Sequence, residues 1–258
     1  MKLNDPERIE EYRLYAGLGC FTRRLDKTKR FIANCLSLCD SPYVAWSGGK
    51  DSTVMLHLVM EQRPDIPAVC VQSELDYPDN VEIVEQTTEE LRVNLILVHP
   101  EASPWEILKK HGGPFGQVNV ASSELDKKCF YEPMNKMVKE HGFDAAFIGL
   151  RAEESRARMM NRRLRGLSYS HKAGMKTFTP LGDWTGRDVF AYLVTRNLPI
   201  NQVYTKTKFH PEPERIREGW WLPGDFSASR GGVTWLKYYY PEKYRELQEH
   251  FPEVASQT

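Results

Sequence analysis

Short apolar runs alternate with amphipathic stretches over the first 150 residues of the chain. Strands are predicted at 43–46, 68–72, 94–98 and 145–148. Apolar positions at a period near 3.6 predict helices at 5–19, 21–39, 51–62, 80–92, 104–111 and 132–141. Strands that take turns with helices are typical of βαβ units and a parallel sheet covered on both faces. The pattern therefore predicts a doubly wound α/β fold.

Near residue 150 the alternation of strand and helix patterns ends and the composition of the sequence changes. An arginine-rich stretch runs to Arg165, a helix is predicted around 186–196, and the end of the chain is rich in tryptophan and tyrosine. We expect three parts: an N-terminal helical segment at 1–40, an α/β domain at 41–205, and an irregular, aromatic-rich extension at 206–258 packed on that domain.

Composition narrows the class of protein. Of the 258 residues, 41% are hydrophobic and 27% charged, which is typical of a globular chain, and the formal net charge is zero. The whole molecule therefore has no electrostatic bias toward nucleic acid or an anionic membrane, and any anion site must come from local clustering. No apolar run is long enough for a membrane span and no secretion signal is seen, so we expect a cytoplasmic protein.

The turn after the first predicted strand carries the clearest chemical signal. It consists of Ser47, Gly48, Gly49, Lys50, Asp51 and Ser52. Two glycines let backbone N–H groups approach phosphate oxygens, and the following helix offers unpaired N–H donors and a partial positive charge. Lys50 adds a mobile cation. The alternative is a tight, serine-capped turn, but the full string between a strand and a helix favours a phosphate site.

Three further stretches extend this signal. They are Gly-Leu-Arg-Ala-Glu-Glu-Ser-Arg at 149–156, Thr-Pro-Leu-Gly-Asp-Trp-Thr at 179–185 with Asp-Val-Phe-Ala-Tyr-Leu at 188–193, and Asn-Leu-Pro-Ile-Asn-Gln-Val-Tyr at 197–204. With the loop, they resemble the adenine-nucleotide α-hydrolase (PP-loop pyrophosphatase) superfamily. Within it, the chain is most similar to the phosphoadenosine-phosphosulfate reductase family, which includes sulfate adenylyltransferase small subunits and DNA-sulfur-modification proteins.

The resemblance covers roughly residues 42–205 and implies an adenine nucleotide bound at the loop. It implies that Gly149, Arg151 and Ser155 face this nucleotide, and that Lys50, Asp51 and Arg151 act in catalysis. Glu74, which follows the second predicted strand, is a candidate for the ribose hydroxyls. The reductases and adenylyltransferases carry Asp-Thr-Gly there, and this sequence does not, so the alternative is that the residues around Glu74 only cap the next helix.

Arginines gather between residues 151 and 165. The candidates for binding an anion or a second substrate are Arg156, Arg158, Arg162, Arg163 and Lys172. Guanidinium groups suit bidentate recognition of phosphate or sulfate. The alternative is a solvated helix face with internal Glu–Arg pairs.

The number and positions of the cysteines help to distinguish between the reactions that the family resemblance implies. Their number is odd, at five, and no C-x-x-C pair is present, so we expect neither a disulfide framework nor an iron–sulfur cluster or other protein-held metal site. Reductases of the family attack the sulfonucleotide with a C-terminal cysteine, whereas no cysteine follows Cys129 in this sequence. Cys129 itself lies beside Lys127 and Lys128 and is either a reactive thiol or a packing residue.

These features predict an enzyme that cleaves ATP, together with Mg²⁺, at the α-phosphate, by adenylyl transfer with release of pyrophosphate. A sulfonucleotide reductase or sulfotransferase is the alternative, and a non-catalytic nucleotide-dependent module that binds nucleic acid or protein is the second. The sequence leaves open the acceptor, for which a nucleic acid and a sulfur-carrying protein are candidates, and assembly as a homodimer.

Overall fold

The structure of the chain is a computed structural model that describes residues 5–116, 118–170, 174–208, 212–216, 220 and 230–256. Contacts divide the chain into two compact units. The first comprises residues 1–70, 79–97 and 141–218, and the second comprises 71–78, 98–140 and 219–258. The three-part division expected from the sequence stays a prediction.

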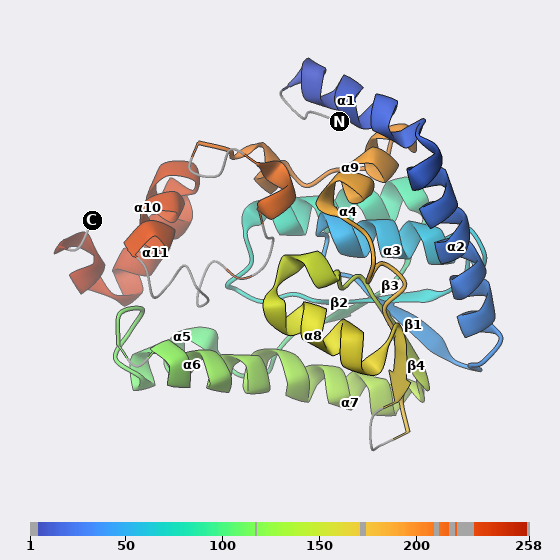
Figure 1. Cartoon of the computed structure of the whole chain (residues 1–258). Coiled ribbons are helices and arrows are strands. Elements are labelled where there is room, and N and C mark those ends of the chain that lie inside the picture. Colours follow the sequence, from blue (N-terminus) through green and yellow to red (C-terminus); the bar gives the residue numbers. More distant parts are fainter. Residues whose placement is uncertain are drawn as a thin grey trace. The chain divides into compact units, whose positions relative to one another are not determined.

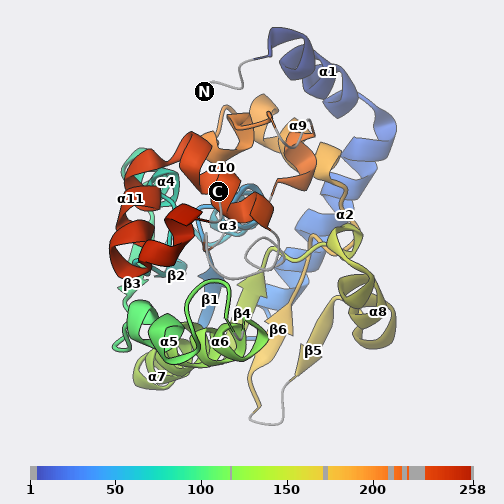
Figure 2. The ribbon, with the colours of Figure 1, turned by 90° about the vertical axis from the view of Figure 1, so that its left-hand side faces the viewer.

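One six-stranded sheet forms the framework, with the strand order β3-β2-β1-β4-β6-β5 (Figures 1 and 2). The strands are β1 (Pro42–Ala45), β2 (Pro67–Val71), β3 (Asn94–Val98), β4 (Ala145–Ile148), β5 (Ser168–Ser170) and β6 (Lys176–Phe178). β1 is parallel to β2 and β4, β4 is parallel to β6, and β5 is antiparallel to β6. The predicted mainly parallel α/β fold is therefore confirmed.

Burial shows that both faces of the central strands are covered. Ala145, Ala146 and Phe147 follow one another in β4, and all three are fully buried. Because successive side chains of a strand point to opposite faces, a continuous buried run requires cover on each side. In β1, Tyr43 and Val44 are buried in the same way.

The first unit contains six helices among its described residues. They are α1 (Pro6–Ala16), α2 (Gly19–Leu36), α3 (Lys50–Met60), α4 (Pro78–Leu91), α8 (Arg156–Arg165) and α9 (Gly186–Thr195), with 3₁₀ turns at Ala152–Glu154, Gln202–Thr205 and Pro213–Arg215. α1 begins after Asp5, whose Oδ1 accepts a hydrogen bond from the N–H of Glu7 at 3.1 Å. It packs on α9, where Tyr12 stacks on Phe190 with ring centroids 5.2 Å apart.

The second unit is mainly helical where it is described. Its helices are α5 (Pro104–Lys110), α6 (Val118–Leu125), a π-helix (Asp126–Tyr131), α7 (Glu132–His141), α10 (Arg230–Tyr239) and α11 (Pro241–His250), followed by a 3₁₀ turn (Pro252–Ser256). Trp105 stacks on His250 with centroids 4.0 Å apart, and Tyr77 stacks on Tyr240 at 4.7 Å. The sequence predicted an irregular extension here. Over 230–256 this expectation is wrong, because most of these residues form helices that pack within this unit.

Within the described part of the chain, no helix has both the length and the apolar composition needed to cross a bilayer.

Candidate functional site

The predicted loop lies at the carboxyl end of β1, between the neighbouring ends of β2 and β4. β1 is paired on both sides, to β2 and to β4, so the chain's direction of travel across the sheet reverses here. A crevice at such a reversal is where open α/β sheets bind ligands. Ser47 is exposed at this edge, whereas Gly48 and Gly49 are buried. The topology therefore supports the position that the sequence gives to the site.

Gly48 satisfies a steric requirement of the loop. Its φ angle is +76°, and a β carbon there would lie 2.9 Å from Cγ2 of Ile83 and 3.0 Å from Cγ2 of Val84. Both the backbone conformation and the lack of space favour glycine. The loop is also held from within, because Ser52 Oγ accepts a hydrogen bond from the Ser47 N–H at 3.2 Å and donates one to the Gly49 carbonyl at 3.0 Å.

The backbone N–H groups that the loop offers to an anion lie at the start of α3, whose N-cap is Gly49. The first turn of a helix leaves N–H groups without an intrahelical partner. One of them is already used, because the Lys50 N–H donates to the Tyr204 hydroxyl at 2.9 Å. Tyr204 was part of a family-like stretch in the sequence, but a role at the loop was not expected for it.

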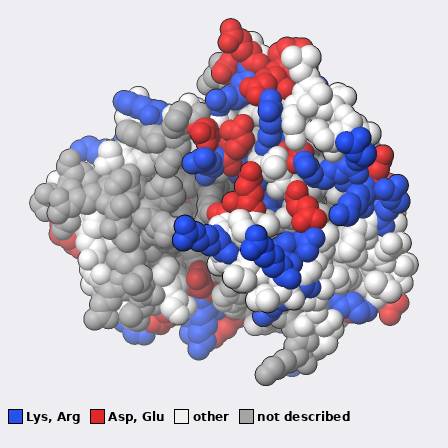
Figure 3. All heavy atoms as spheres, in the orientation of Figure 1, with Lys and Arg blue, Asp and Glu red and all other residues white. Residues whose placement is uncertain are grey.

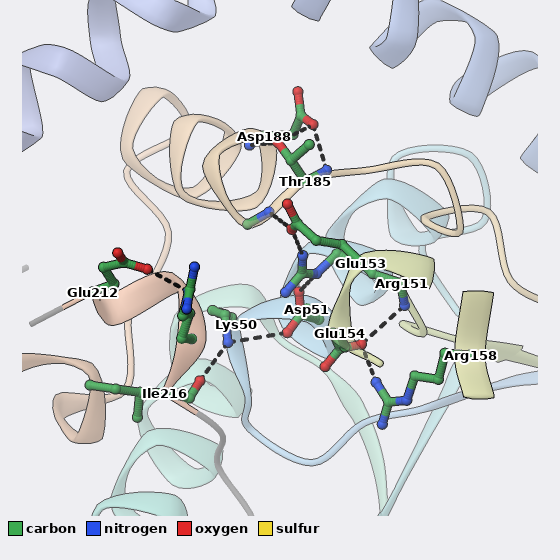
Figure 4. A network of polar contacts seen from close by, with 12 residues as sticks. Lys50, Asp51, Arg151, Glu153, Glu154, Arg158, Thr185, Asp188, Glu212 and Ile216 are labelled. Carbon is green, nitrogen blue, oxygen red and sulfur yellow. Dashed lines mark hydrogen bonds and ion pairs between the residues drawn. The ribbon is translucent and has the colours of Figure 1, made fainter. Parts of the chain in front are cut away.

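Lys50 differs from the mobile cation that we expected. Only 4% of the residue is exposed. Its Nζ donates to the carbonyl of Ile216 at 2.8 Å, lies 3.4 Å from Asp51 Oδ2, and sits 4.6 Å from the centroid of the Tyr204 ring. The expectation of mobility is wrong because three groups, two of them more than 150 residues away in sequence, hold the ammonium in place. Figure 4 shows two of them, the carbonyl of Ile216 and the carboxylate of Asp51.

Arg151 reaches the same cluster from the end of β4. A β carbon on Gly149 would lie 2.7 Å from the backbone oxygen of Asp51, so glycine allows this close approach of the two segments. The Arg151 Nε lies 2.5 Å from Asp51 Oδ1, and its Nη1 lies 2.6 Å from Glu153 Oε2 (Figure 4). The structure thus brings together the three predicted catalytic residues, Lys50, Asp51 and Arg151.

The electrostatics of this cluster keep Arg151 charged. Burial, at 2% exposure, would lower the pKa of its guanidinium, but the carboxylates of Asp51, Glu154 and Glu153 outweigh burial and raise that pKa. Glu153 also accepts a hydrogen bond from the Gly186 N–H, at the start of α9, at 2.7 Å. Arg151 is therefore a fixed positive charge whose neighbours are anchored as well.

A cavity of about 700 Å³ adjoins this cluster. Its charged lining residues are Arg8, Lys50, Arg151, Arg187 and Arg215, together with Glu11, Glu153, Glu154, Glu212 and Glu214. Basic and acidic side chains also lie next to one another on the face that Figure 3 shows. A wall that carries both signs of charge suits a polar ligand.

The predicted anion-binding arginines on α8 divide into two groups. Arg158 pairs with Glu154, as the alternative of Glu–Arg pairs predicted, whereas Arg162 forms two hydrogen bonds of 2.9 Å to the carboxylate of Asp183, which lies outside the helix and was not predicted as a partner. Arg156 and Arg163 are exposed, and the described residues provide neither with an ion pair. Lys172 lies outside the described residues. Anion binding at this helix stays a prediction.

Ser155 caps α8, because its Oγ accepts a hydrogen bond from the Arg158 N–H at 3.1 Å. Glu74 belongs to the second unit, where its side chain is exposed and its carbonyl accepts a hydrogen bond from Lys243. Two residues on, Asp76 Oδ2 accepts from the Ser73 N–H at 2.6 Å and closes a local turn. Nucleotide contacts of Ser155 and Glu74 stay predictions.

Cys129 is a packing residue. It is fully buried in the π-helix, and its Sγ lies 3.6 Å from the carbonyl oxygen of Ala102. Burial, with a smaller effect of Glu74, raises the pKa of the Cys129 thiol to about 11. Lys128 pairs with Glu132 at 3.0 Å, so it is not free to stabilise a thiolate. A nucleophilic thiolate is disfavoured at neutral pH.

We expect the alkylation of Cys129 by iodoacetamide at pH 8 to be at least ~100-fold slower than that of the exposed Cys20, because only about one thiol in 1,000 with a pKa near 11 is ionised there. The rate for Cys129 should rise about tenfold per pH unit up to pH 10. Mass spectrometry of digests gives both rates, and urea should equalise them. Equal rates in the native protein would show that Cys129 is a reactive thiol.

Comparison with known proteins identifies similar sequences and folds. The family described as "Phosphoadenosine phosphosulfate reductase domain" matches residues 41–240. A phosphoadenosine 5'-phosphosulfate reductase of Xanthomonas axonopodis pv. citri (strain 306) is 31% identical over 186 residues, which cover 71% of this chain and 69% of the relative.

Two solved structures share the fold at low sequence identity. The phosphoadenylyl-sulfate reductase of Candida auris, in a phosphate complex, is 18% identical to this chain with a TM-score of 0.60. The match covers 86% of this chain and 97% of the Candida auris chain. FMN adenylyltransferase of Candida glabrata is 15% identical with a TM-score of 0.55, and the match covers 77% of this chain and 65% of the Candida glabrata chain. Both likenesses concern the fold alone.

Proposed function

The chain belongs to the phosphoadenosine phosphosulfate reductase family, and on that premise we propose that it is an enzyme that binds ATP at the loop of residues 47–52 and cleaves it at the α-phosphate. The observation that carries the proposal is the cluster of Lys50, Asp51 and Arg151, two buried cations on one carboxylate beside the helix start. Such fixed positive charge suits a polyphosphate leaving group.

The reaction would proceed by adenylyl transfer. An oxygen lone pair of the acceptor forms a bond to the α-phosphorus, the bond from this phosphorus to the bridging oxygen breaks, and pyrophosphate leaves with the electron pair. The chain would bind the β- and γ-phosphates with the N–H groups at the start of α3 and neutralise the developing charge with Lys50 and Arg151. No covalent protein intermediate is needed, which agrees with the buried state of Cys129.

Mg²⁺ would enter this site with the nucleotide. The described residues hold no group of three or more His, Cys, Asp or Glu side chains suited to a metal. Asp51 is the carboxylate in the loop, and Arg151 and Lys50 lie on its two oxygens, so it suits at most a water-mediated contact. The ion would be bound by phosphate oxygens, as is common for Mg²⁺, and would supply further neutralisation of charge.

The acceptor would occupy the cavity of about 700 Å³ that Lys50 and Arg151 line. Since the other lining residues are mainly charged, the cavity favours a polar acceptor over an apolar one. This placement puts the acceptor next to both cations.

The test is to incubate the protein with Mg²⁺ and ATP, and separately with phosphoadenosine phosphosulfate and a dithiol reductant, and to measure pyrophosphate, sulfite and adenosine bisphosphate. Pyrophosphate from ATP is the expected product. Tight binding of ATP without any turnover, with an affinity that single-stranded nucleic acid alters, would instead support a non-catalytic module.

A sulfonucleotide reductase is the second candidate function. It is favoured by the relatives, which carry the name of this activity at 30–31% identity. Sulfite release that Cys129→Ser abolishes would support it and overturn the adenylyl-transfer proposal. Because the thiol is buried and its pKa is raised to about 11, we expect Cys129→Ser to leave pyrophosphate release unchanged.

A further inference from the structure

Tyr204 contacts the loop lysine at two different points. Its hydroxyl accepts a hydrogen bond from the Lys50 backbone N–H at 2.9 Å, and the centroid of its ring lies 4.6 Å from the Lys50 Nζ. One side chain therefore constrains both the first residue of α3 and the ammonium at the end of that residue's side chain. We propose that Tyr204 is a positioning residue for the nucleotide site, which acts on bound phosphate through Lys50. This inference rests on the proposed function of the loop.

The surroundings of Tyr204 make it a rigid support. The residue is 1% exposed and lies in the 3₁₀ turn Gln202–Thr205, which Asn201 caps by accepting a hydrogen bond from the Val203 N–H at 2.9 Å. Its ring packs edge-on against Phe190 of α9, with centroids 5.7 Å apart and an angle of 90° between the planes. A side chain held in this way cannot move aside without disturbing the turn and α9.

The two contacts have separate consequences for a bound nucleotide. The hydrogen bond uses the Lys50 N–H, so phosphate oxygens would bind to the other donors of the loop, and the hydroxyl fixes the angle at which α3 begins. The ring face is electron-rich and stabilises the desolvated ammonium of Lys50 by a cation–π interaction. It also limits the rotamers of Lys50, so less conformational entropy is lost when the ammonium meets a phosphate.

Two substitutions separate these effects. Tyr204→Phe removes the hydroxyl and keeps the ring, and calorimetry should show a dissociation constant for Mg-ATP raised about 3- to 10-fold, the loss expected of one hydrogen bond. Tyr204→Leu also removes the ring, and the dissociation constant should rise about 30-fold or more.

Introducing Lys50→Met into each variant tests whether Tyr204 acts through Lys50. The effect of the hydroxyl should persist, because the backbone N–H remains. The further difference between Tyr204→Phe and Tyr204→Leu should shrink to less than about twofold, because the ring has lost its cation. An unchanged difference in the Lys50→Met background, or wild-type affinity in both single variants, would overturn the proposal.

Tyr192→Phe is the matched control. Tyr192 is fully buried, and its hydroxyl lies 2.9 Å from Nδ1 of His57 in the same helix α3, away from the loop. Loss of this hydroxyl in Tyr192→Phe should lower the stability of the protein about as much as Tyr204→Phe does, but it should leave the affinity for ATP unchanged. An equal loss of affinity in Tyr192→Phe would show that general loosening of α3, rather than positioning of Lys50, is responsible.

Urea unfolding of the same variants keeps the inference separate from the proposed function. The double-mutant cycle between Lys50→Met and Tyr204→Leu should show a coupling of about fivefold or more in the unfolding equilibrium constant, with or without nucleotide. If the wild-type protein binds no adenine nucleotide, the proposed function fails, and this cycle alone decides whether Tyr204 positions Lys50. A coupling within experimental error of zero would overturn the inference, whatever the nucleotide result.

Discussion

Replacing Lys50 with methionine is expected to weaken the binding of Mg-ATP about 10- to 100-fold, because a charge-assisted hydrogen bond to phosphate contributes about 1.5–3 kcal/mol. The rate of pyrophosphate release at saturating ATP should fall by a further factor of about 10²–10³, the usual effect of removing a preorganised electrostatic group. Calorimetry gives the affinity, and a coupled pyrophosphate assay gives kcat. Methionine is preferred to alanine because it fills the same buried space beside Tyr204 and Ile216.

The fold should survive this substitution, so that a change in affinity or kcat can be assigned to the loss of the ammonium group. Lys50→Met removes the hydrogen bond to the Ile216 carbonyl, but Asp51 keeps its contact with Arg151. Lys29→Met is the control, since Lys29 pairs with Glu61 at 2.9 Å just beyond the other end of α3. Wild-type affinity and kcat in Lys50→Met, or an equal loss in Lys29→Met, would contradict the proposed site.

The sequence predicted the β1–loop–α3 unit well because its signals are local. Four strands and most helices of the first 150 residues lie within a few residues of their predicted bounds, and α3 begins at Lys50, directly after the glycine pair. Gly48 and Gly149 were identified as part of motifs, and the structure gives the physical reason, which is the lack of room for a β carbon. Such steric requirements leave a mark at a single position that sequence reading can detect.

The partners of Lys50 could not be predicted in the same way. Tyr204 and Ile216 lie 154 and 166 residues further along the chain, and nothing in the local pattern at either position indicates a contact with the loop. The pairing of Arg158 with Glu154 was foreseen only as a general alternative of Glu–Arg pairs, and that of Arg162 with Asp183 was not foreseen, because the sequence does not show which carboxylate each arginine meets. Pairings of this kind depend on the tertiary fold.

The C-terminal helices were missed for a different reason. α10 has an apolar face, but it contains the glycine pair Gly231-Gly232 and ends in the aromatic pair Tyr238-Tyr239, and none of these residues favours a helix. Short strands such as β5 and β6, of three residues each, also carry too little periodicity to be recognised. In both cases packing stabilises an element whose own sequence signal is weak.

Replacing Arg151 with methionine is expected to have the second large effect, this time on both stability and activity. The guanidinium is 2% exposed and contacts Asp51 at 2.5 Å and Glu153 at 2.6 Å, so its removal leaves carboxylates without their buried partner. Breaking a buried ion pair from one side costs about 3–5 kcal/mol. Urea unfolding should show this loss, and pyrophosphate release should fall by about 10²-fold or more because one of the two fixed cations is gone.

Arg24→Met distinguishes the loss of charge at the site from a general loss of stability. Arg24 pairs with the fully buried carboxylate of Asp188, so its replacement should also destabilise the fold, but it does not line the cavity. We therefore expect Arg24→Met to lower the midpoint of urea unfolding while ATP affinity and kcat, measured well below that midpoint, stay at wild-type values. If both arginine variants lost activity in proportion to stability, Arg151 would be a structural residue, and the neutralisation of phosphate charge would have to come from Lys50 and the helix start alone.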